Sequence, residues 1–152
     1  MESSIIMLVE HTDQATKMML QNVIDRKKKF DKIKRDHLFV TLATLLLGFL
    51  FLIYLYVFIV KPYYYSFFDM FSMFVNHYIN LFYMLTVFGY YGYMLYLKKE
   101  LDKAEKEYHD LRCEIIDKSK DLWKQEEAWK NRHKVFELMK EKFDINLYHE
   151  NK

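Results

Sequence analysis

Three side chains that can ligate a metal ion follow one another at four-residue spacing in the C-terminal third of the chain. Glu105, His109 and Cys113 would stack on one face of a helix, and these residue types hold zinc in proteins. One helix, however, supplies at most two or three of the four ligands that a zinc site needs, and Glu and His at this spacing are common solvated neighbours. We therefore expect no metal site here.

Motifs that carry catalysis or cofactor binding are absent from the sequence. The chain has three glycines and one cysteine, so it contains neither a glycine-rich phosphate loop nor a cysteine pair. HExxH and nucleophilic serine motifs are also absent. A net charge of +2 is too small to indicate nucleic-acid binding. The sequence predicts a protein that is not an enzyme, holds no cofactor and has no nucleic-acid or small-molecule partner.

Two long uncharged runs decide which elements the chain builds. Leu38 to Val60 is 23 residues without a charged residue or histidine, and Met70 to Leu97 is 28 residues interrupted only by His77. A bilayer core of about 30 Å needs roughly 20 apolar residues in a helix. The sequence therefore predicts an all-α protein with a two-span transmembrane hairpin.

The predicted boundaries follow from the ends of these runs. The first transmembrane helix is placed at 38–60, where Pro62 is expected to end it, and the second at 75–97. The connecting segment 61–74 is rich in tyrosine and phenylalanine, which is typical of the membrane interface. Asn76 and Asn80 are expected in the outer interface rather than in a polar path through the bilayer.

Basic residues on either side of the runs predict the orientation. Twelve of them flank the ends of the two runs that point away from the connector, whereas the connector itself holds Lys61 alone. The positive-inside rule then places both termini in the cytoplasm. The cluster before the first span serves either as a topology signal alone or also as a binding site for anionic lipids. It consists of Arg26, Lys27, Lys28, Lys29, Lys32, Lys34 and Arg35.

Small residues lie at matching depths in the two spans. An antiparallel hairpin would bring Thr44 beside Gly92 and Gly48 beside Gly89, and small side chains let helix backbones approach closely. Because the sequence has no GxxxG motif, we interpret these four positions as contacts between the two spans of one chain.

The segment 98–145 is predicted to form one long cytoplasmic helix of coiled-coil type. No glycine or proline follows Tyr93, and every seventh position from Met94 to Phe143 is apolar. The companion heptad position becomes polar after Ile115. The heptad stripe therefore narrows along the helix to a row of large rings.

The N-terminal segment 1–37 is predicted to be an amphipathic helix that packs on this long helix. From a start near Thr12 it reaches about residue 123 of its partner. Apolar side chains beyond that point have no predicted cover and need a partner. We expect these side chains to mediate homo-oligomerisation or binding to a membrane complex. Residues 146–152 are predicted to form a tail. The predicted contact residues are Ile115 and Leu122 of the heptad stripe and, beyond the reach of the N-terminal helix, Trp129, Phe136, Met139 and Phe143.

The whole pattern resembles a known family. A charged N-terminal arm, two spans joined by KPYYYSFFD, and a Lys/Glu-rich tail containing WKQEEAWKNRH are similar to the YpbF-type small membrane proteins of low-GC Gram-positive bacteria. The resemblance covers the full chain, and it implies a bacterial plasma membrane and no catalytic residue. We expect a non-catalytic assembly, scaffold or regulatory subunit. The alternative is a pore-forming or holin-like protein, which would need a water-lined face in the spans.

Overall fold

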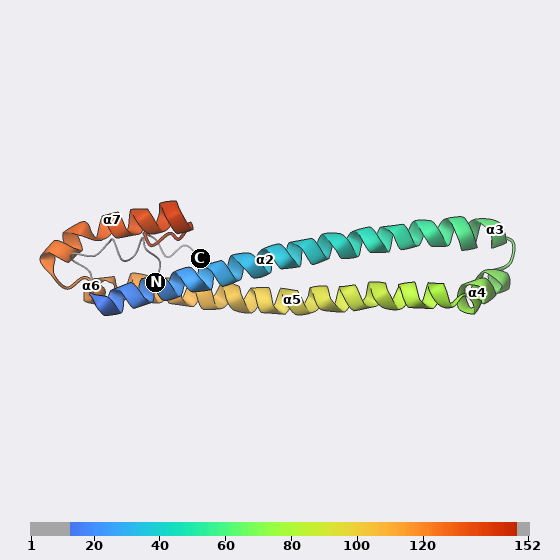
Figure 1. The fold of residues 1–152 in the computed structure, drawn as a ribbon, viewed down its shortest axis with the longest axis horizontal. Helices are drawn as coiled ribbons and strands as arrows, with labels where there is room; N and C mark the ends of the chain where they lie inside the picture. The colour runs from blue at the N-terminus through green and yellow to red at the C-terminus, as the bar shows by residue number, and fades with distance from the viewer. Residues whose placement is uncertain (1–12, 149–152) are drawn as a thin grey trace. The chain divides into compact units, whose positions relative to one another are not determined.

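The computed structural model describes residues 13–148, and every regular element in this range is a helix (Figure 1). The prediction of an all-α protein is therefore confirmed. Residues 1–12 and 149–152 lie outside the described residues. The predictions for the start of the N-terminal helix and for the end of the tail fall on these residues. The elements are α2 (Gln14–Leu55), the π-helix η1 (Tyr56–Val60), α3 (Lys61–Tyr63), α4 (Phe67–Asn76), α5 (Tyr78–Asp117), α6 (Ser119–Leu122) and α7 (Glu126–Phe143).

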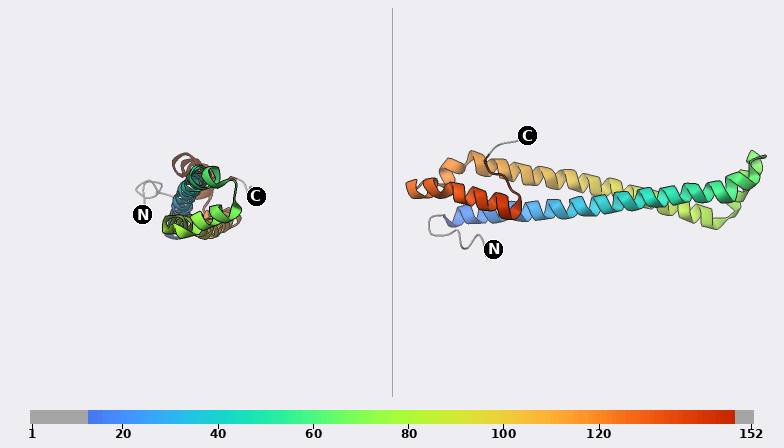
Figure 2. Two further views of the ribbon diagram at one scale, coloured as in Figure 1. Left: turned by 90° about the vertical axis from the view of Figure 1, so that its right-hand side faces the viewer. Right: turned by 90° about the horizontal axis from the view of Figure 1, so that it is seen from above.

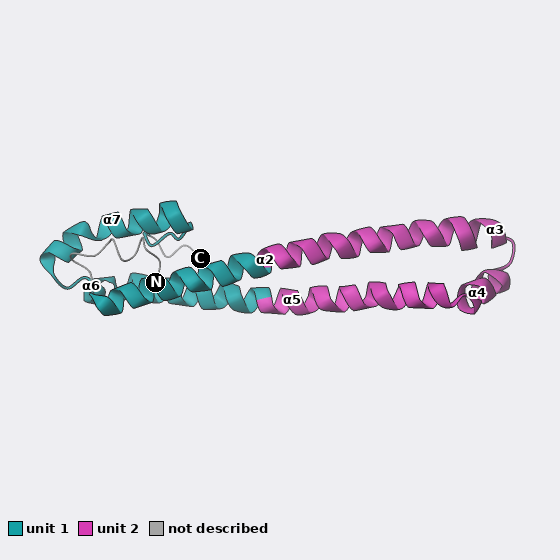
Figure 3. Cartoon of the chain, in the orientation of Figure 1, with its two compact units in different colours: residues 1–33, 101–152 teal, residues 34–100 magenta. Residues whose placement is uncertain are grey.

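The chain divides into two compact units, shown in different colours in Figure 3. Unit 1 comprises Met1–Ile33 and Leu101–Lys152, and unit 2 comprises Lys34–Glu100. The long helices α2 and α5 each contribute one part to each unit. Each unit is described separately below.

Unit 2 is a pair of helices that are joined at one end by short helical segments (Figure 2). The rings of Phe51 on α2 and Tyr83 on α5 stack with their centroids 4.9 Å apart. The hydroxyl of Tyr83 also lies 3.5 Å from the backbone oxygen of Leu47. Aromatic contacts thus connect the two helices of this unit.

The first helix does not end at Val60 as the sequence predicted, because it continues through Pro62 to Tyr63. Proline lacks a backbone N–H, and its ring clashes with the carbonyl of residue i−4, which here is Phe58. The helix widens into the π-turn η1 at this point, and the N–H of Lys61 bonds to the oxygen of Tyr56. A widened turn of this kind accommodates the proline without ending the helix.

The second uncharged run forms two helices rather than one. Ser66 caps α4, since its hydroxyl accepts a hydrogen bond from the N–H of Asp69 at 3.2 Å. His77 then adopts an extended conformation, with φ −94° and ψ 102°, and α5 begins at Tyr78. The predicted start of the second helix at residue 75 is therefore wrong, because residues 75 and 76 belong to α4 and α5 begins at Tyr78. About 20 residues from Tyr78 to Leu97 remain for the apolar part of α5, which is about 30 Å of helix.

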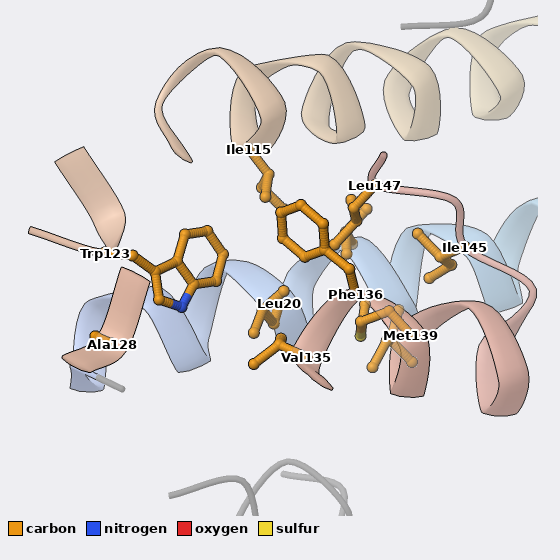
Figure 4. Packing of buried hydrophobic residues seen from close by; sticks show 11 residues of the cluster. Leu20, Ile115, Trp123, Ala128, Val135, Phe136, Met139, Ile145 and Leu147 are labelled. Carbon is orange, nitrogen blue, oxygen red and sulfur yellow. The ribbon is translucent and has the colours of Figure 1, made fainter. Parts of the chain in front are cut away.

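In the described part of unit 1, the tail folds back on the two long helices. The helix α5 ends at Asp117, the short α6 follows, and α7 packs on the parts of α2 and α5 that belong to this unit (Figure 4). The predicted single helix over residues 98–145 is wrong. Tertiary packing overrides local helix propensity here, since the turn buries Trp123 to 2% exposure.

The end of α7 directs the last described residues into the same core. Asp144 adopts the left-handed conformation at φ 56°, and its N–H bonds to the oxygen of Lys140 at 3.1 Å. This bond is that of an αL cap, and the N–H of Ile145 bonds in addition to the oxygen of Met139 at 3.1 Å. As a result, Ile145 and Leu147 are fully buried.

The two units differ sharply in where their apolar side chains lie. Of the 32 large hydrophobic residues that are exposed among residues 13–148, 30 lie between Leu38 and Tyr96, in unit 2. The other two are Met18 and Tyr148. Unit 1 therefore has a core of the kind that soluble domains have, whereas unit 2 displays its apolar side chains.

Candidate functional site

The three residues of the sequence that could ligate a metal all lie on α5. His109 Nε2 lies 3.7 Å from Cys113 Sγ, and Glu105 is exposed one turn away. Within residues 13–148, no group of three or more His, Cys, Asp or Glu side chains is arranged to hold a metal ion. The pair of His109 and Cys113 is a contact between neighbours on one helix.

Three residues of the predicted basic cluster on α2 have carboxylate partners within unit 1. Arg26 forms a salt bridge with Glu107, and Lys29 Nζ lies 3.8 Å from the same carboxylate. Lys27 Nζ lies 3.3 Å from Asp31 and 3.5 Å from Asp144. These three basic side chains therefore contact acidic residues of unit 1. The other members of the cluster are exposed, as Arg26 and Lys29 also are: Lys28, Lys32, Lys34 and Arg35.

Lys27 and Tyr108 form the most perturbed titratable pair in this region. Burial lowers the pKa of Lys27, but the carboxylates of Asp31 and Asp144 outweigh this effect, so that the pKa of Lys27 lies above its ordinary value. Burial also raises the pKa of Tyr108. The ammonium group lies 5.6 Å from the ring centroid of Tyr108 and 5.7 Å from that of Phe30, which adds cation–π attraction.

The predicted distal contact residues face the core of unit 1. Phe136 is 6% exposed and Met139 is fully buried, and both pack with Leu20 of α2 and Ile115 of α5 (Figure 4). The sequence argument that these side chains lie beyond the reach of any intrachain cover is therefore wrong, because the fold-back brings them next to α2. The other predicted contact residues are partly buried against the same cluster: Leu122, Trp129 and Phe143.

The small residues of unit 2 do not make the tight contact that the sequence predicted. A Cβ added at Gly48, Gly89 or Gly92 would meet no atom within 4 Å. Thr44 is buried, but its hydroxyl donates to the oxygen of Val40 on its own helix at 2.8 Å. Gly48 instead borders a space of about 620 Å³. The two helices are therefore held together at other positions.

Asn80 is one such position, and sequence reasoning assigned it to the wet interface. Its side chain is 1% exposed. Its Oδ1 accepts a hydrogen bond from the hydroxyl of Tyr54 at 2.9 Å, and its Nδ2 donates to the oxygen of Phe74 at 3.0 Å. This residue thus links α2, α4 and α5, and its contacts satisfy buried polar groups at the break before α5. In the sequence, the signal for this contact was that Asn80 lies on the same helical face as Tyr83.

A hollow at the turn between α6 and α7 was also not predicted. It has a volume of about 340 Å³ and is lined by Lys120, Trp123, Lys124, Glu126 and Trp129. The indole N–H of Trp123 is buried and has no hydrogen-bond partner within the part of the chain that the structure describes. The two tryptophans of the sequence, six positions apart and each close to a lysine, were the signal for this site.

The length and composition of one helix suit a membrane span. Gln14–Tyr63 has 50 residues, and only 11% of its apolar window is buried. It is the one helix within residues 13–148 that is long and apolar enough to cross a membrane. The apolar part of α5 contains more tyrosine, including Tyr90, Tyr91 and Tyr93.

Comparisons with known proteins agree with the resemblance that the sequence suggested. The Bacillus subtilis (strain 168) protein described as "Uncharacterized protein YpbF" is 38% identical over 152 residues, which cover all of both chains. No solved structure matches this chain. A family model described as "Protein of unknown function (DUF2663)" matches residues 19–150. The chain therefore belongs to the DUF2663 family, which includes this YpbF-type relative and in which nothing points to an enzyme.

Proposed function

We propose that this protein is a two-span membrane protein of the bacterial plasma membrane that acts without catalysis, as an assembly, scaffold or regulatory subunit. Unit 2 provides the membrane anchor, and unit 1 is a helical domain in the cytoplasm. The observation that carries the proposal is the exposure of 30 large hydrophobic side chains within unit 2. A soluble monomer rarely exposes apolar patches of more than a few hundred Å², whereas lipid solvates such a surface without cost.

The second span of this proposal is the first half of α5. The segment from Tyr78 to Leu97 carries no charged residue, and about 20 helical residues match the thickness of the hydrocarbon core. Its tyrosines near Leu97 lie where an aromatic belt is expected. The preceding helix α4, with Phe67 and Phe68 almost fully exposed, would lie in the outer interface.

The orientation of the proposal rests on charge. Twelve basic residues flank the ends of the two spans that lead into unit 1, and Lys61 is the one basic residue in the connector. Unit 1 therefore stays in the cytoplasm under the positive-inside rule. The exposed Lys32 and Arg35 would lie near anionic headgroups, at about 1 kcal/mol for each basic residue.

The fold of unit 1 changes how a partner would be bound. The apolar side chains that the sequence assigned to self-association face the core, and Met18 and Tyr148 are the exposed large hydrophobic residues of the described part of this unit. Association with a second copy or with a membrane complex therefore uses the polar surface of unit 1 or the lipid-facing surface of unit 2 in this proposal.

Thiol labelling in intact cells tests the anchor and its orientation together. In a Cys113→Ser background, Ser66→Cys in the connector should react with a membrane-impermeant thiol reagent. Lys134→Cys on α7, which is exposed, should react only after the cells are permeabilised. The reverse pattern would overturn the orientation, and labelling of neither residue before permeabilisation would overturn the two-span anchor.

Liposomes separate the proposed role from that of a pore. Purified protein reconstituted into dye-loaded vesicles should cause no leakage, because the polar groups of Tyr54 and Asn80 bond to each other and unit 2 otherwise displays apolar side chains. Leakage that scales with the amount of protein would contradict the proposed role as an assembly, scaffold or regulatory subunit. It would favour the pore-forming alternative.

A further inference from the structure

The turn between α6 and α7 forms a hollow of a size that suits a small ligand. Its volume of about 340 Å³ lies at the lower end of the range for ligand pockets, which is about 300 to 1,000 Å³. Five residues line it: Lys120, Trp123, Lys124, Glu126 and Trp129. All of them belong to unit 1, so the hollow does not depend on how the chain sits in a membrane.

Two indole rings form walls that are fixed by their neighbours. Trp123 is 2% exposed, and the edge of its ring system meets the ring of Phe136 at a centroid distance of 5.5 Å. The guanidinium carbon of Arg132 lies 3.3 Å from the ring centroid of Trp129. Because Trp123 is almost fully buried, the indole that a ligand can reach is that of Trp129, and indole rings are flat surfaces on which planar rings stack.

The charges around the hollow favour an anion. Lys120 and Lys124 are exposed, and neither forms an ion pair with another residue of the range 13–148. The lining carboxylate of Glu126 is already paired, because Lys130 Nζ lies 3.0 Å from its Oε1. Two ammonium groups are thus available to a negatively charged ligand, and the opposing carboxylate is largely neutralised.

Trp123 provides a second, independent observation. Its indole N–H is buried without an acceptor among the described residues, although buried indole groups usually have one. The ring that carries this donor also lines the hollow. The fold therefore leaves one donor of a lining residue without a partner among the described residues.

We propose that this hollow binds a small planar anion, in which a flat ring stacks on the indole of Trp129 while a carboxylate or phosphate group contacts Lys120 and Lys124. Nucleoside monophosphates and aromatic carboxylates share this chemistry. Such a ligand would make unit 1 a sensing domain, which goes beyond the role of a subunit. The proposal stands on unit 1 alone, so that it can fail or hold independently of the two-span anchor.

Tryptophan fluorescence tests the proposal directly, since the chain contains two tryptophans and both line the hollow. The full-length protein in mild detergent is titrated with adenosine monophosphate and with salicylate, which are the two sources of a planar anion. We expect a saturable change in emission with at least one of them. Adenosine and inorganic phosphate, which supply the ring or the charge alone, should bind at least about tenfold more weakly if each part contributes about 1.4 kcal/mol.

A pair of double variants separates the hollow from general charge effects. Lys120→Gln with Lys124→Gln should weaken binding of the planar anion about tenfold, because each exposed charge contact contributes up to about a factor of five. Lys134→Gln with Lys140→Gln changes two exposed lysines of α7 outside the hollow and should leave the affinity unchanged. Circular dichroism verifies that both variants retain their helix content.

Two results would overturn the proposal. The first is the absence of a saturable emission change with either planar anion. The second is binding that Lys120→Gln with Lys124→Gln leaves intact, or that adenosine or inorganic phosphate alone reproduces at equal affinity. Neither result would bear on the membrane anchor, which is tested by thiol labelling.

Discussion

Unit 1 and unit 2 are built from the same two long helices, yet they treat apolar side chains in opposite ways. In unit 1, Leu20, Ile115 and Met139 are at most 1% exposed. In unit 2, Phe49 and Phe82 are 63% and 72% exposed. The difference shows that helix formation alone does not decide where apolar groups point, and in our proposal the two units have different surroundings.

The tail illustrates how unit 1 reaches its core. Two helices alone leave one side of each apolar stripe open to water, and α7 closes it by folding back. In unit 2 no third helix covers the pair, and a space of about 620 Å³ remains beside Gly48. We interpret this contrast as the difference between a domain that is solvated by water and one that is solvated by lipid.

Truncating the core of unit 1 should have the largest effect. Phe136→Ala removes a ring that contacts both Trp123 and Tyr148, at centroid distances of 5.5 and 5.4 Å, and should destabilise unit 1 by about 3 to 5 kcal/mol. Urea unfolding followed by tryptophan emission measures this, since both tryptophans belong to unit 1. The matched control, Phe82→Ala in unit 2, should not shift the transition, and equal shifts would contradict the division into two units.

A charge on the exposed surface should distinguish the units almost as strongly. Leu46 is 60% exposed in unit 2 and Met18 is 55% exposed in unit 1. If lipid surrounds unit 2, Leu46→Lys should cost about 2.5 to 3.5 kcal/mol of insertion free energy, whereas Met18→Lys should cost almost nothing. The fraction of protein that resists alkaline extraction from membranes measures the difference. Equal tolerance of both lysines would argue that water surrounds both units.

The hydrogen bond between Tyr54 and Asn80 should contribute less. Tyr54→Phe removes the hydroxyl that donates to Asn80 Oδ1, and hydrogen bonds between membrane helices contribute about 0.6 kcal/mol on average and about 1.7 at most. The matched control is Tyr56→Phe, because Tyr56 is 61% exposed and makes no comparable contact among the described residues. Unfolding of unit 2 in mixed micelles, followed by crosslinking of the two helices, should distinguish the variants. A larger loss from Tyr56→Phe would refute this assignment.

Alkaline pH should weaken unit 1 selectively and modestly. The pKa values of Lys27 and Tyr108 are both raised in the folded state, above ordinary values of 10.5 and 10.0. The stability that they contribute is therefore complete below pH 10 and is lost as the pH rises through the folded-state values. The urea midpoint of the native chain should be lower above pH 10 than below it. The decrease should be smaller for Lys27→Gln with Tyr108→Phe. An unchanged midpoint in the native chain would contradict the assigned pKa shifts.

The sequence predicted that both uncharged runs of unit 2 are helical, because charge-free runs of this length have few other structures. It missed the break at His77 and the continuation through Pro62, since each depends on a local adjustment that the residue types do not specify. Asn80 was placed in the interface because its depth was counted from Leu97 alone. Its burial depends on Tyr54, which is 26 positions away and forms the matching contact.

The fold-back of unit 1 escaped the sequence for a related reason. The turn at 118–125 contains no glycine or proline, and the stripe from Ile115 to Phe143 fits one long helix as well as two helices that face each other. The polar companion positions Lys118 and Gln125 fall within the turn, and they were the sign that the stripe does not continue as a coiled coil. The hollow beside Trp123 exists only because of this turn, so it could not be predicted before the turn was known.

Site-directed spin labelling tests most directly whether lipid covers unit 2. Labels at Leu46 on α2 and Phe82 on α5 are compared with labels at Met18 and Lys134 in unit 1, all four positions being exposed. In reconstituted vesicles, the first two labels should collide readily with oxygen and rarely with a water-soluble nickel chelate, and the other two should show the reverse. Ready collision of the chelate with the labels at positions 46 and 82 would contradict a membrane-embedded unit 2.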